Sequence, residues 1–363
     1  YYKLEADLDF EQEKEMSLFP SKNTGFSGKL YGNGHTLKNI KLAANEYSGL
    51  FGYMNNAVVQ DLKIENINLA LTSSVKYAGA ISGFAQNTQL KNITIQTFTL
   101  NVAEKKDMVT SYDAYMGGLV GKTETTENKQ CIIENCSLSG VDINLKEIKT
   151  TSSKAVYSGL FVGHLAGETG VSNSNASGNF TAKLKTNATV YVGGFAGANS
   201  AAKRITSCYT DGTIEVTRID SSSKLSVGGF IGANVDGWCN LFDCLAIQDI
   251  KILADSDEEK ATTTKLANTA YVGGLIGNLT NRSPEGINQC LYVPKKDGIK
   301  VVTQVTGKTT DDVVKYDDVL VSLTIAKIND SLKAQIRDVY SMEDKLASVS
   351  YTHLRAHETL SDL

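Results

Sequence analysis

The metal-like motif near the C-terminus is the first place where residue types and spacing suggest chemistry. His353 and His357 stand four residues apart, and Glu358 follows directly. On one face of a helix, two histidines at this spacing can bind zinc, and a neighbouring glutamate can serve as a base. The motif predicts a zinc site only if this segment belongs to the folded protein.

The segment that carries these histidines is set aside for another reason. Residues 348–359 read Ser-Val-Ser-Tyr-Thr-His-Leu-Arg-Ala-His-Glu-Thr, which resembles one reading frame of a transposon-type sequencing adapter. We therefore interpret residues 348–363 as an artefactual tail and exclude them from fold reasoning. The two other histidines are His35, in a glycine-rich turn, and His164, after a glycine segment. We interpret both as structural.

Carboxylates are the remaining candidates for catalysis. Asp211, Asp236, Asp243 and Asp249 are scattered along the chain, whereas a glycosidase or polysaccharide lyase needs paired acids or a calcium cluster. Asp236 stands two residues before Trp238, the single tryptophan, and an indole ring can stack on a sugar. We name Asp236 and Trp238 as candidates for ligand contact. The sequence holds no other recognised catalytic motif, so we predict no enzyme and no catalytic, cofactor-binding or metal-binding residue.

Seven glycine-marked segments show which elements must position these residues. Each reads as an aromatic or small residue, a small residue, glycine, a second small residue, two apolar residues and a last glycine, and the first copy is one residue short. The spacing varies from 30 residues (Gly49 to Gly79) to 45 (Gly228 to Gly273). Recurrence of this kind predicts stacked units with polar insertions that leave the core as loops. The third-position glycines are Gly49, Gly79, Gly117, Gly159, Gly193, Gly228 and Gly273.

A second pattern follows the glycine segments after 10 to 15 residues. It reads apolar-polar-polar-apolar-polar-apolar, as at residues 59–64, 90–95, 133–138 and 287–292. Its alternating end is typical of a strand with one buried face. Such short strands cannot bury that face alone, but stacked units can. We predict an all-β fold, a right-handed parallel β-helix (solenoid) over residues 1–305.

The cysteines follow the same repeat. Four of the six fall at one point of the second pattern, where other repeats carry Leu62, Ile93 and Ser174; they are Cys136, Cys208, Cys244 and Cys290. A position shared with leucine and isoleucine predicts an inward-facing column of thiols, because a reduced cysteine packs as a small apolar residue. Cys131 and Cys239 are better placed for a disulfide, although they belong to different repeats.

The repeats resemble the GLUG motif, named for its Gly-Leu-x-Gly core. Residues 49–52 read Gly-Leu-Phe-Gly, and residues 26–37 resemble the usual first coil, F-x-G-x-F-D-G-N-G-H-T-I, with Tyr31 where aspartate is common. The resemblance covers residues 2–294. This motif recurs in bacterial surface proteins and beside the peptidase unit of the immunoglobulin A metalloprotease family. It implies a β-helix on the outside of a cell, and it implies no reaction.

The pattern changes after Pro294. Residues 298–305 can form one more strand, and an apolar stripe at helical spacing runs through residues 319–336. We predict that residues 306–347 are a short helical cap over the open end of the solenoid, or the start of a further domain.

Composition limits the function further. The 363 residues carry a net charge of -4, so a nucleic acid is not the expected partner. The chain has no run of 18 apolar residues and no signal peptide, and we interpret it as a fragment of a larger chain with neighbouring domains. We predict a non-catalytic secreted or cell-surface module, a scaffold, spacer or adhesin whose variable loops contact glycans or proteins of a host or cell wall. The alternative is a carbohydrate-active β-helix.

Overall fold

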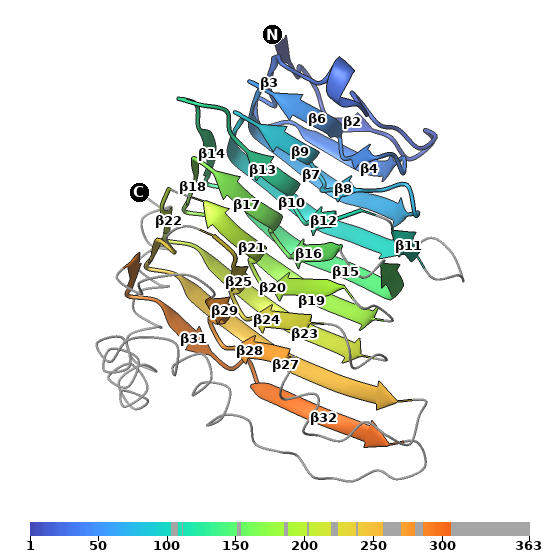
Figure 1. Ribbon diagram of the computed structural model, residues 1–363. Helices are drawn as coiled ribbons and strands as arrows, with labels where there is room; N and C mark the ends of the chain where they lie inside the picture. The colour runs from blue at the N-terminus through green and yellow to red at the C-terminus, as the bar shows by residue number, and fades with distance from the viewer. Residues whose placement is uncertain are drawn as a thin grey trace.

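Short parallel strands, stacked coil upon coil, build the molecule (Figure 1). The computed structural model describes residues 1–102, 108–110, 112–150, 154–184, 188–201, 203–218, 224–236, 239–256, 270–279 and 286–305. Within these ranges the one helical element with both ends described is a 3₁₀ turn, η1 (Lys22–Thr24), and no described helix is long and apolar enough to cross a membrane.

Two sheets of seven strands each form adjacent faces of the solenoid. The first, which we call the tyrosine sheet, consists of β5 (Tyr47–Ser48), β8 (Tyr77–Ala78), β12 (Ala114–Gly117), β16 (Ala155–Gly159), β20 (Thr189–Gly193), β24 (Lys224–Gly228) and β28 (Ala270–Gly273). The second, which we call the corner sheet, consists of β6 (Phe51–Asn55), β9 (Ser82–Gln86), β13 (Val120–Glu124), β17 (Val162–Gly167), β21 (Ala196–Ala201), β25 (Ile231–Asn234) and β29 (Ile276–Leu279).

An 18-stranded sheet, the long sheet, forms the rest of the wall. It opens with β1 (Tyr2–Lys3), β2 (Leu8–Asp9), β3 (Lys29–Tyr31), β4 (Thr36–Leu42), β7 (Val58–Leu71), β10 (Gln89–Val102), β11 (Met108–Thr110), β14 (Cys131–Glu134) and β15 (Ser137–Thr150). It continues through β18 (Thr169–Ser172), β19 (Asn175–Leu184), β22 (Ile205–Thr206), β23 (Tyr209–Arg218), β26 (Leu241–Phe242), β27 (Leu245–Ser256), β30 (Ile287–Asn288), β31 (Leu291–Val293) and β32 (Ile299–Val305).

The order of the strands explains the fold. One coil runs from the tyrosine sheet through the corner sheet to the long sheet, as β12, β13, β14 and β15 do. Each strand then pairs in parallel with its equivalent one coil away, as β12 does with β8 and β16. The predicted all-β parallel β-helix is therefore confirmed. The predicted cap at residues 306–347 and the tail at 348–363 lie outside the described residues.

The glycine repeat marks the corner between two sheets. Gly117 lies opposite Gly159, and the same register carries Gly159 onto Gly193 and so on to Gly273. A Cβ atom added at Gly159 would lie only 2.7 Å from the carbonyl oxygen of Phe195 and 2.8 Å from the nitrogen of Gly197. Glycine recurs here because the backbones of stacked coils approach too closely for any side chain.

A second corner is made by polar residues of the apolar-polar-polar pattern. Its third residue has a positive φ in seven successive coils, between 48° and 58°. Asparagine and aspartate tolerate this left-handed conformation better than most residues. They also bind one another along the axis: Asn92 Nδ2 donates to Asp61 Oδ1 at 2.7 Å, and Asn135 Nδ2 donates to Asn92 Oδ1 at 3.1 Å. The seven corner residues are Asp61, Asn92, Asn135, Asn173, Ser207, Asp243 and Gln289.

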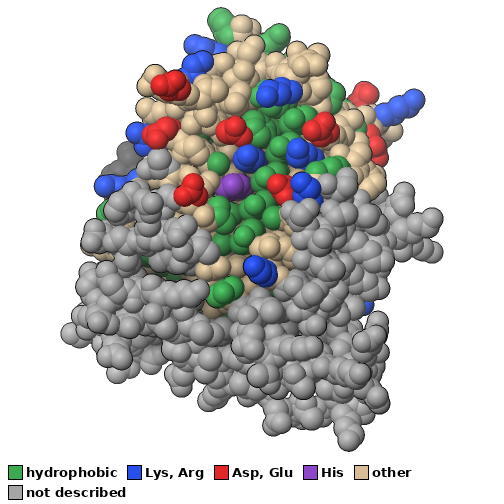
Figure 2. Space-filling model, in the orientation of Figure 1, with side chains coloured by type: hydrophobic (Ala, Val, Ile, Leu, Met, Phe, Trp, Pro, Cys, Tyr) green, Lys and Arg blue, Asp and Glu red, His purple; other side chains and the backbone are tan. Residues whose placement is uncertain are grey.

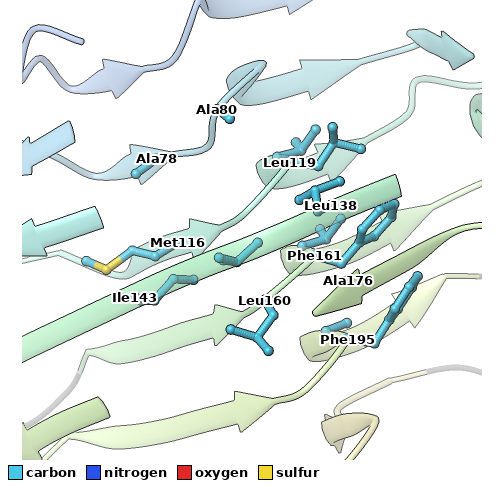
Figure 3. Close-up of a cluster of buried hydrophobic side chains, with 14 of the residues drawn as sticks. Ala78, Ala80, Met116, Leu119, Leu138, Ile143, Leu160, Phe161, Ala176 and Phe195 are labelled. Atoms are coloured by element: carbon cyan, nitrogen blue, oxygen red, sulfur yellow. The ribbon is translucent and has the colours of Figure 1, made fainter. Parts of the chain in front are cut away.

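Apolar side chains from successive coils fill the space between the sheets, and some of them form columns of one residue type, such as Phe161 and Phe195 (Figure 3). Phe161, Phe195 and Phe230 are fully buried and stack with ring centroids 4.4 and 4.6 Å apart. The cysteines form another column, because Cys244 stands between Cys208 and Cys290 in register. All six cysteines are thiols, five of them buried, so the predicted thiol column is confirmed.

Candidate ligand-binding face

The two residues predicted to contact a ligand can be placed only in part. Asp236 is exposed just after β25, where its backbone carbonyl accepts a hydrogen bond of 3.5 Å from Asn234 Nδ2. Trp238 lies outside the described residues. The pairing of a carboxylate with an indole at this corner therefore stays a prediction.

Two of the four carboxylates that were expected to be scattered in fact contact the same turn. Asp211 on β23 lies opposite Ile247 on β27, two residues before Asp249. Lys295 Nζ forms an ion pair with Asp211 Oδ1 at 2.8 Å. Asp249 Oδ1 accepts three backbone N–H groups from residues 296–298, at 2.8 to 2.9 Å. Sequence reasoning missed this arrangement because the turn lies more than 40 positions further along the chain.

These contacts give both carboxylates a structural use. Hydrogen bonds from the turn outweigh burial and hold the pKa of Asp249 below its usual range. The two acids thus fasten the turn between β31 and β32 to the coil before it. Asp243 is one of the left-handed corner residues, so its type is explained by backbone conformation. Among the described residues no group of three or more histidine, cysteine or acidic side chains is arranged to hold a metal ion.

The outer side of the tyrosine sheet carries a continuous aromatic column. Five tyrosines, one per coil, stack with ring centroids 4.8 to 5.1 Å apart and planes within 21° of parallel. The first four of them belong to an aromatic cluster separate from the main core. Because the rings cover one another's faces along the axis, only ring edges remain for a ligand at the inner rungs. The column is Tyr47, Tyr77, Tyr115, Tyr157 and Tyr191.

A second column from the corner sheet lines the tyrosines. Tyr53, Phe84, Lys122 and His164 stand in register on successive strands. Tyr53 and Phe84 stack at 5.2 Å with planes 4° apart. The Lys122 ammonium lies 5.3 Å from the ring centre of Tyr115 and 5.7 Å from that of Phe84, and it pairs with Glu124 at 3.0 Å. Figure 2 shows the result, a strip of apolar side chains with a histidine in its middle and charges along its margins.

His164 is the least ordinary residue of this strip. Its side chain is 9 % exposed, and its Nε2 lies 2.9 Å from Ser200 Oγ. Its Nδ1 is buried without a hydrogen-bond partner. Burial, with the nearby Lys122 charge as a smaller cause, lowers the pKa of His164 to about 3. The imidazole is therefore neutral and packs as a ring in the column. Aligning the seven glycine segments would have found it, since it takes the place of Phe84.

The tyrosine column is interrupted in the sixth coil. Ser226 stands in register between Tyr191 and Tyr271, so the regular stack of rings ends at Tyr191. On the corner sheet the equivalent column also changes, from His164 to Ala198 and Ala233. The aromatic strip thus belongs to the first five coils. Burial raises the pKa of Tyr47 and of Tyr157 to about 12, so their hydroxyls are uncharged at neutral pH.

The opening histidine is structural as well. His35 Nδ1 lies 3.2 Å from Asp7 Oδ1, and the same oxygen accepts the backbone N–H of Thr36 at 2.9 Å. The glycine-rich turn is thereby tied to the chain that precedes it. Among the described residues, Asp7 is the ionisable partner that these contacts give His35.

Comparison with known proteins bears on the repeat. The family model of the GLUG motif matches residues 112–144. The chain carries a GLUG motif. The GLUG match covers β12, β13, β14 and the first half of β15, which together are one complete coil. The matched motif thus corresponds to one turn of the solenoid. The strand register aligns the six other glycine segments with the glycine segment of this turn.

One solved structure is similar in outline. It is a candidate immunoglobulin A1 protease from Bacteroides ovatus, 16% identical, with a TM-score of 0.43, and the match covers 84% of this chain and 77% of that chain. The comparison with curated proteins gave no match.

Proposed function

We propose that this chain is a non-catalytic β-helix module of a secreted or cell-surface bacterial protein, a rigid spacer that presents ligand-binding loops. The observation that carries the proposal is where the polar insertions of the sequence fall, since most of them follow a strand of the long sheet and precede a strand of the tyrosine sheet. They connect the long sheet to the tyrosine sheet of the next coil, after β10, β15, β23 and β27.

β7 and β10 end in register, and so do β19 and β23, whereas β15 runs on past the end of β10 and pairs there with β11. Val102 pairs with Leu71, Leu184 with Arg218 and Arg218 with Ala254. Loops that start from aligned strand ends are spaced by about 4.8 Å per coil. Variable polar segments arranged in this way along one edge can contact a long polymer or a protein surface at several points, as the loops of repeat proteins do. We call this edge, which is formed by the C-terminal ends of β10, β15, β23 and β27, the loop edge.

The remaining surface suits a spacer. The aromatic strip stacks on itself, and the ion pairs of the long sheet join successive coils, as Lys38–Glu65 at 3.2 Å and Lys91–Glu134 at 3.1 Å do. Such contacts repeat along the axis and stiffen each junction between neighbours. The expected ligands are glycans or proteins of a host or a cell wall.

A binding experiment tests the proposal. The chain is applied to arrays of host and cell-wall glycans and to host matrix proteins, next to a variant whose residues 219–223 and 257–269 are replaced by glycine and serine of equal length. We expect binding by the parent chain and at least a tenfold loss in the variant. The matched control, Lys91→Ser with Glu134→Ser, removes an ion pair between the start of β10 and β14, away from the loop edge. It should bind as the parent does. Equal binding by the loop variant would contradict the assignment.

The second candidate is a carbohydrate-active β-helix, and one observation favours it: Asp211 and Asp249 contact the same turn. A screen for polysaccharide cleavage distinguishes the two. We expect no turnover, because both carboxylates are occupied by Lys295 and by backbone N–H groups. Turnover that disappears in Asp211→Asn would overturn the spacer proposal.

A further inference from the structure

The column of cysteines changes its character in the last coils. Cys136 has Ile93 and Ser174 as its neighbours in register, so no thiol stands beside it. Cys208, Cys244 and Cys290 occupy three consecutive coils. Backbone hydrogen bonds fix this register: Leu245 N donates to Cys208 O, and Leu291 N donates to Cys244 O, both at 2.9 Å.

Contact between two of these thiols is direct. The Cys244 and Cys290 side chains are within hydrogen-bonding distance of each other. Adjacent parallel strands place equivalent Cα atoms about 4.8 Å apart, inside the range of roughly 4.4–6.8 Å that a disulfide spans. Both side chains project into the solenoid from neighbouring coils. We propose that Cys244 and Cys290 form a reversible disulfide that locks the seventh coil to the sixth.

Two observations favour this pair over Cys208 with Cys244. Cys208 and Cys244 are both about 1 % exposed, whereas Cys290 is partly exposed and can meet a reagent first. The coil that carries Cys244 is paired on both sides, through β23 and β31. Among the described strands β31 pairs with β27 alone, so it is freer than the sixth coil to adjust when a sulfur–sulfur bond of about 2.05 Å forms.

The chemistry is thiol–disulfide exchange with a small disulfide such as oxidised glutathione. The Cys290 sulfur attacks one sulfur of the reagent, which breaks the sulfur–sulfur bond and releases one glutathione, protonated by the proton that Cys290 loses. Cys244 then attacks the Cys290 sulfur and expels the second glutathione, again as a thiol. Two protein thiols are oxidised, and one glutathione disulfide is reduced to two glutathiones.

The test is oxidation of the folded full chain with oxidised glutathione, followed by alkylation of the remaining thiols and peptide mass mapping. We expect four alkylated cysteines and one peptide pair joined through Cys244 and Cys290, both reversed by dithiothreitol. Cys136→Ser should leave this crosslink unchanged, and Cys290→Ser should abolish it. Amide hydrogen exchange over residues 291–293 should slow at least about tenfold in the oxidised chain, because the disulfide suppresses local opening.

Three results would overturn the inference. They are a crosslink that uses Cys208 or Cys239, a glutathione adduct that persists on Cys290, and six unmodified thiols in the folded chain. Because the mapping is done on the parent sequence, the result does not depend on whether either variant folds.

Discussion

The imidazole of His164 stacks on the ring of Tyr157 with centroids 5.0 Å apart and planes 10° from parallel. It also lies 5.9 Å from the ring of Tyr115, which itself stacks on Tyr157 at 4.8 Å. A histidine in this place behaves as an aromatic rung that must stay uncharged. The column therefore contains one group whose protonation would put a charge among buried rings and next to Lys122.

The buried, neutral imidazole of His164 predicts that the stability of the fold decreases in acid. The pKa of His164 falls from 6.5 to about 3 on folding, through burial first and the Lys122 charge second. The unfolded chain thus binds the proton more tightly, so the stabilisation is complete above pH 6.5 and is lost progressively as the pH falls towards about 3. The loss is on the order of a few kcal/mol. Urea unfolding at a series of pH values measures it.

The matched variant is His164→Phe, which keeps a ring in the column and removes the titration. Its free energy of unfolding should depend less on pH than that of the parent between pH 6.5 and about 3. Asp7, Asp9 and Asp249 also have lowered pKa values, and their contributions cancel in the difference between the two chains. Parallel pH curves for parent and variant would rule out His164 as the acid-sensitive group.

The glycine corner predicts a large loss of stability for a single methyl group. Gly159→Ala places a Cβ 2.7 Å from the carbonyl oxygen of Phe195 and 2.8 Å from the nitrogen of Gly197. Since backbone atoms of two coils must move, we expect a cost of about 3 kcal/mol or more. Gly170→Ala is the control, because its nearest neighbour would be 3.7 Å away. Thermal melting compares the two, and an equal shift in both would refute the close-approach explanation.

The polar corner predicts that glycine destabilises the fold less than alanine does at position 92. Asn92 has a φ of 52° and exchanges side-chain hydrogen bonds with Asp61 and Asn135. Asn92→Ala loses both bonds and leaves in the left-handed region a residue without the polar side chain that makes asparagine tolerant of it, at about 2 kcal/mol or more. Asn92→Gly loses the same bonds without the conformational cost, so it should be about 1 kcal/mol more stable than the alanine variant. An alanine variant as stable as the glycine variant would show that backbone conformation does not select the residue.

These two corners also show how far the sequence could predict the fold. The glycines recur because backbone contacts exclude side chains, so the repeat is visible in the sequence and its register follows from it. In the sequence the polar corner could be recognised only as part of the apolar-polar pattern. Asparagine, aspartate, serine and glutamine all adopt the same positive φ there, so no single residue type marks the corner. Contacts such as that of Asp249 with residues 296–298 join distant segments, and no local pattern marks them. Trp238 and the expected cap fall outside the described residues.

The tyrosine column predicts coupling between neighbouring coils. Tyr115 stacks on Tyr77 at 5.1 Å and on Tyr157 at 4.8 Å, so Tyr115→Ala should cost about 3 kcal/mol. A double-mutant cycle of Tyr115→Ala with Tyr157→Ala should give a coupling energy of about 1 kcal/mol. Tyr209→Ala is the control, since Tyr209 is 36% exposed and takes part in none of the ring stacks among the described residues. Additive losses in the cycle would mean that the rings pack without specific stacking.

The turn after β31 predicts a local effect at the end of the described solenoid. Asp249 Oδ1 accepts the N–H groups of Lys296, Asp297 and Gly298, so Asp249→Ala leaves three donors without this acceptor and should cost roughly 2 kcal/mol. Asp249→Asn keeps an oxygen at the same place and should cost less. The parent's stability at this turn is present above pH 3.8, the ordinary pKa, and is lost as the pH falls through the lowered pKa of the folded state.

Hydrogen exchange of residues 299–305 should quicken in the alanine variant while that of residues 58–71 stays unchanged, because β32 pairs with β27 just beyond this turn. Faster exchange in both segments would instead indicate that Asp249 supports the whole solenoid.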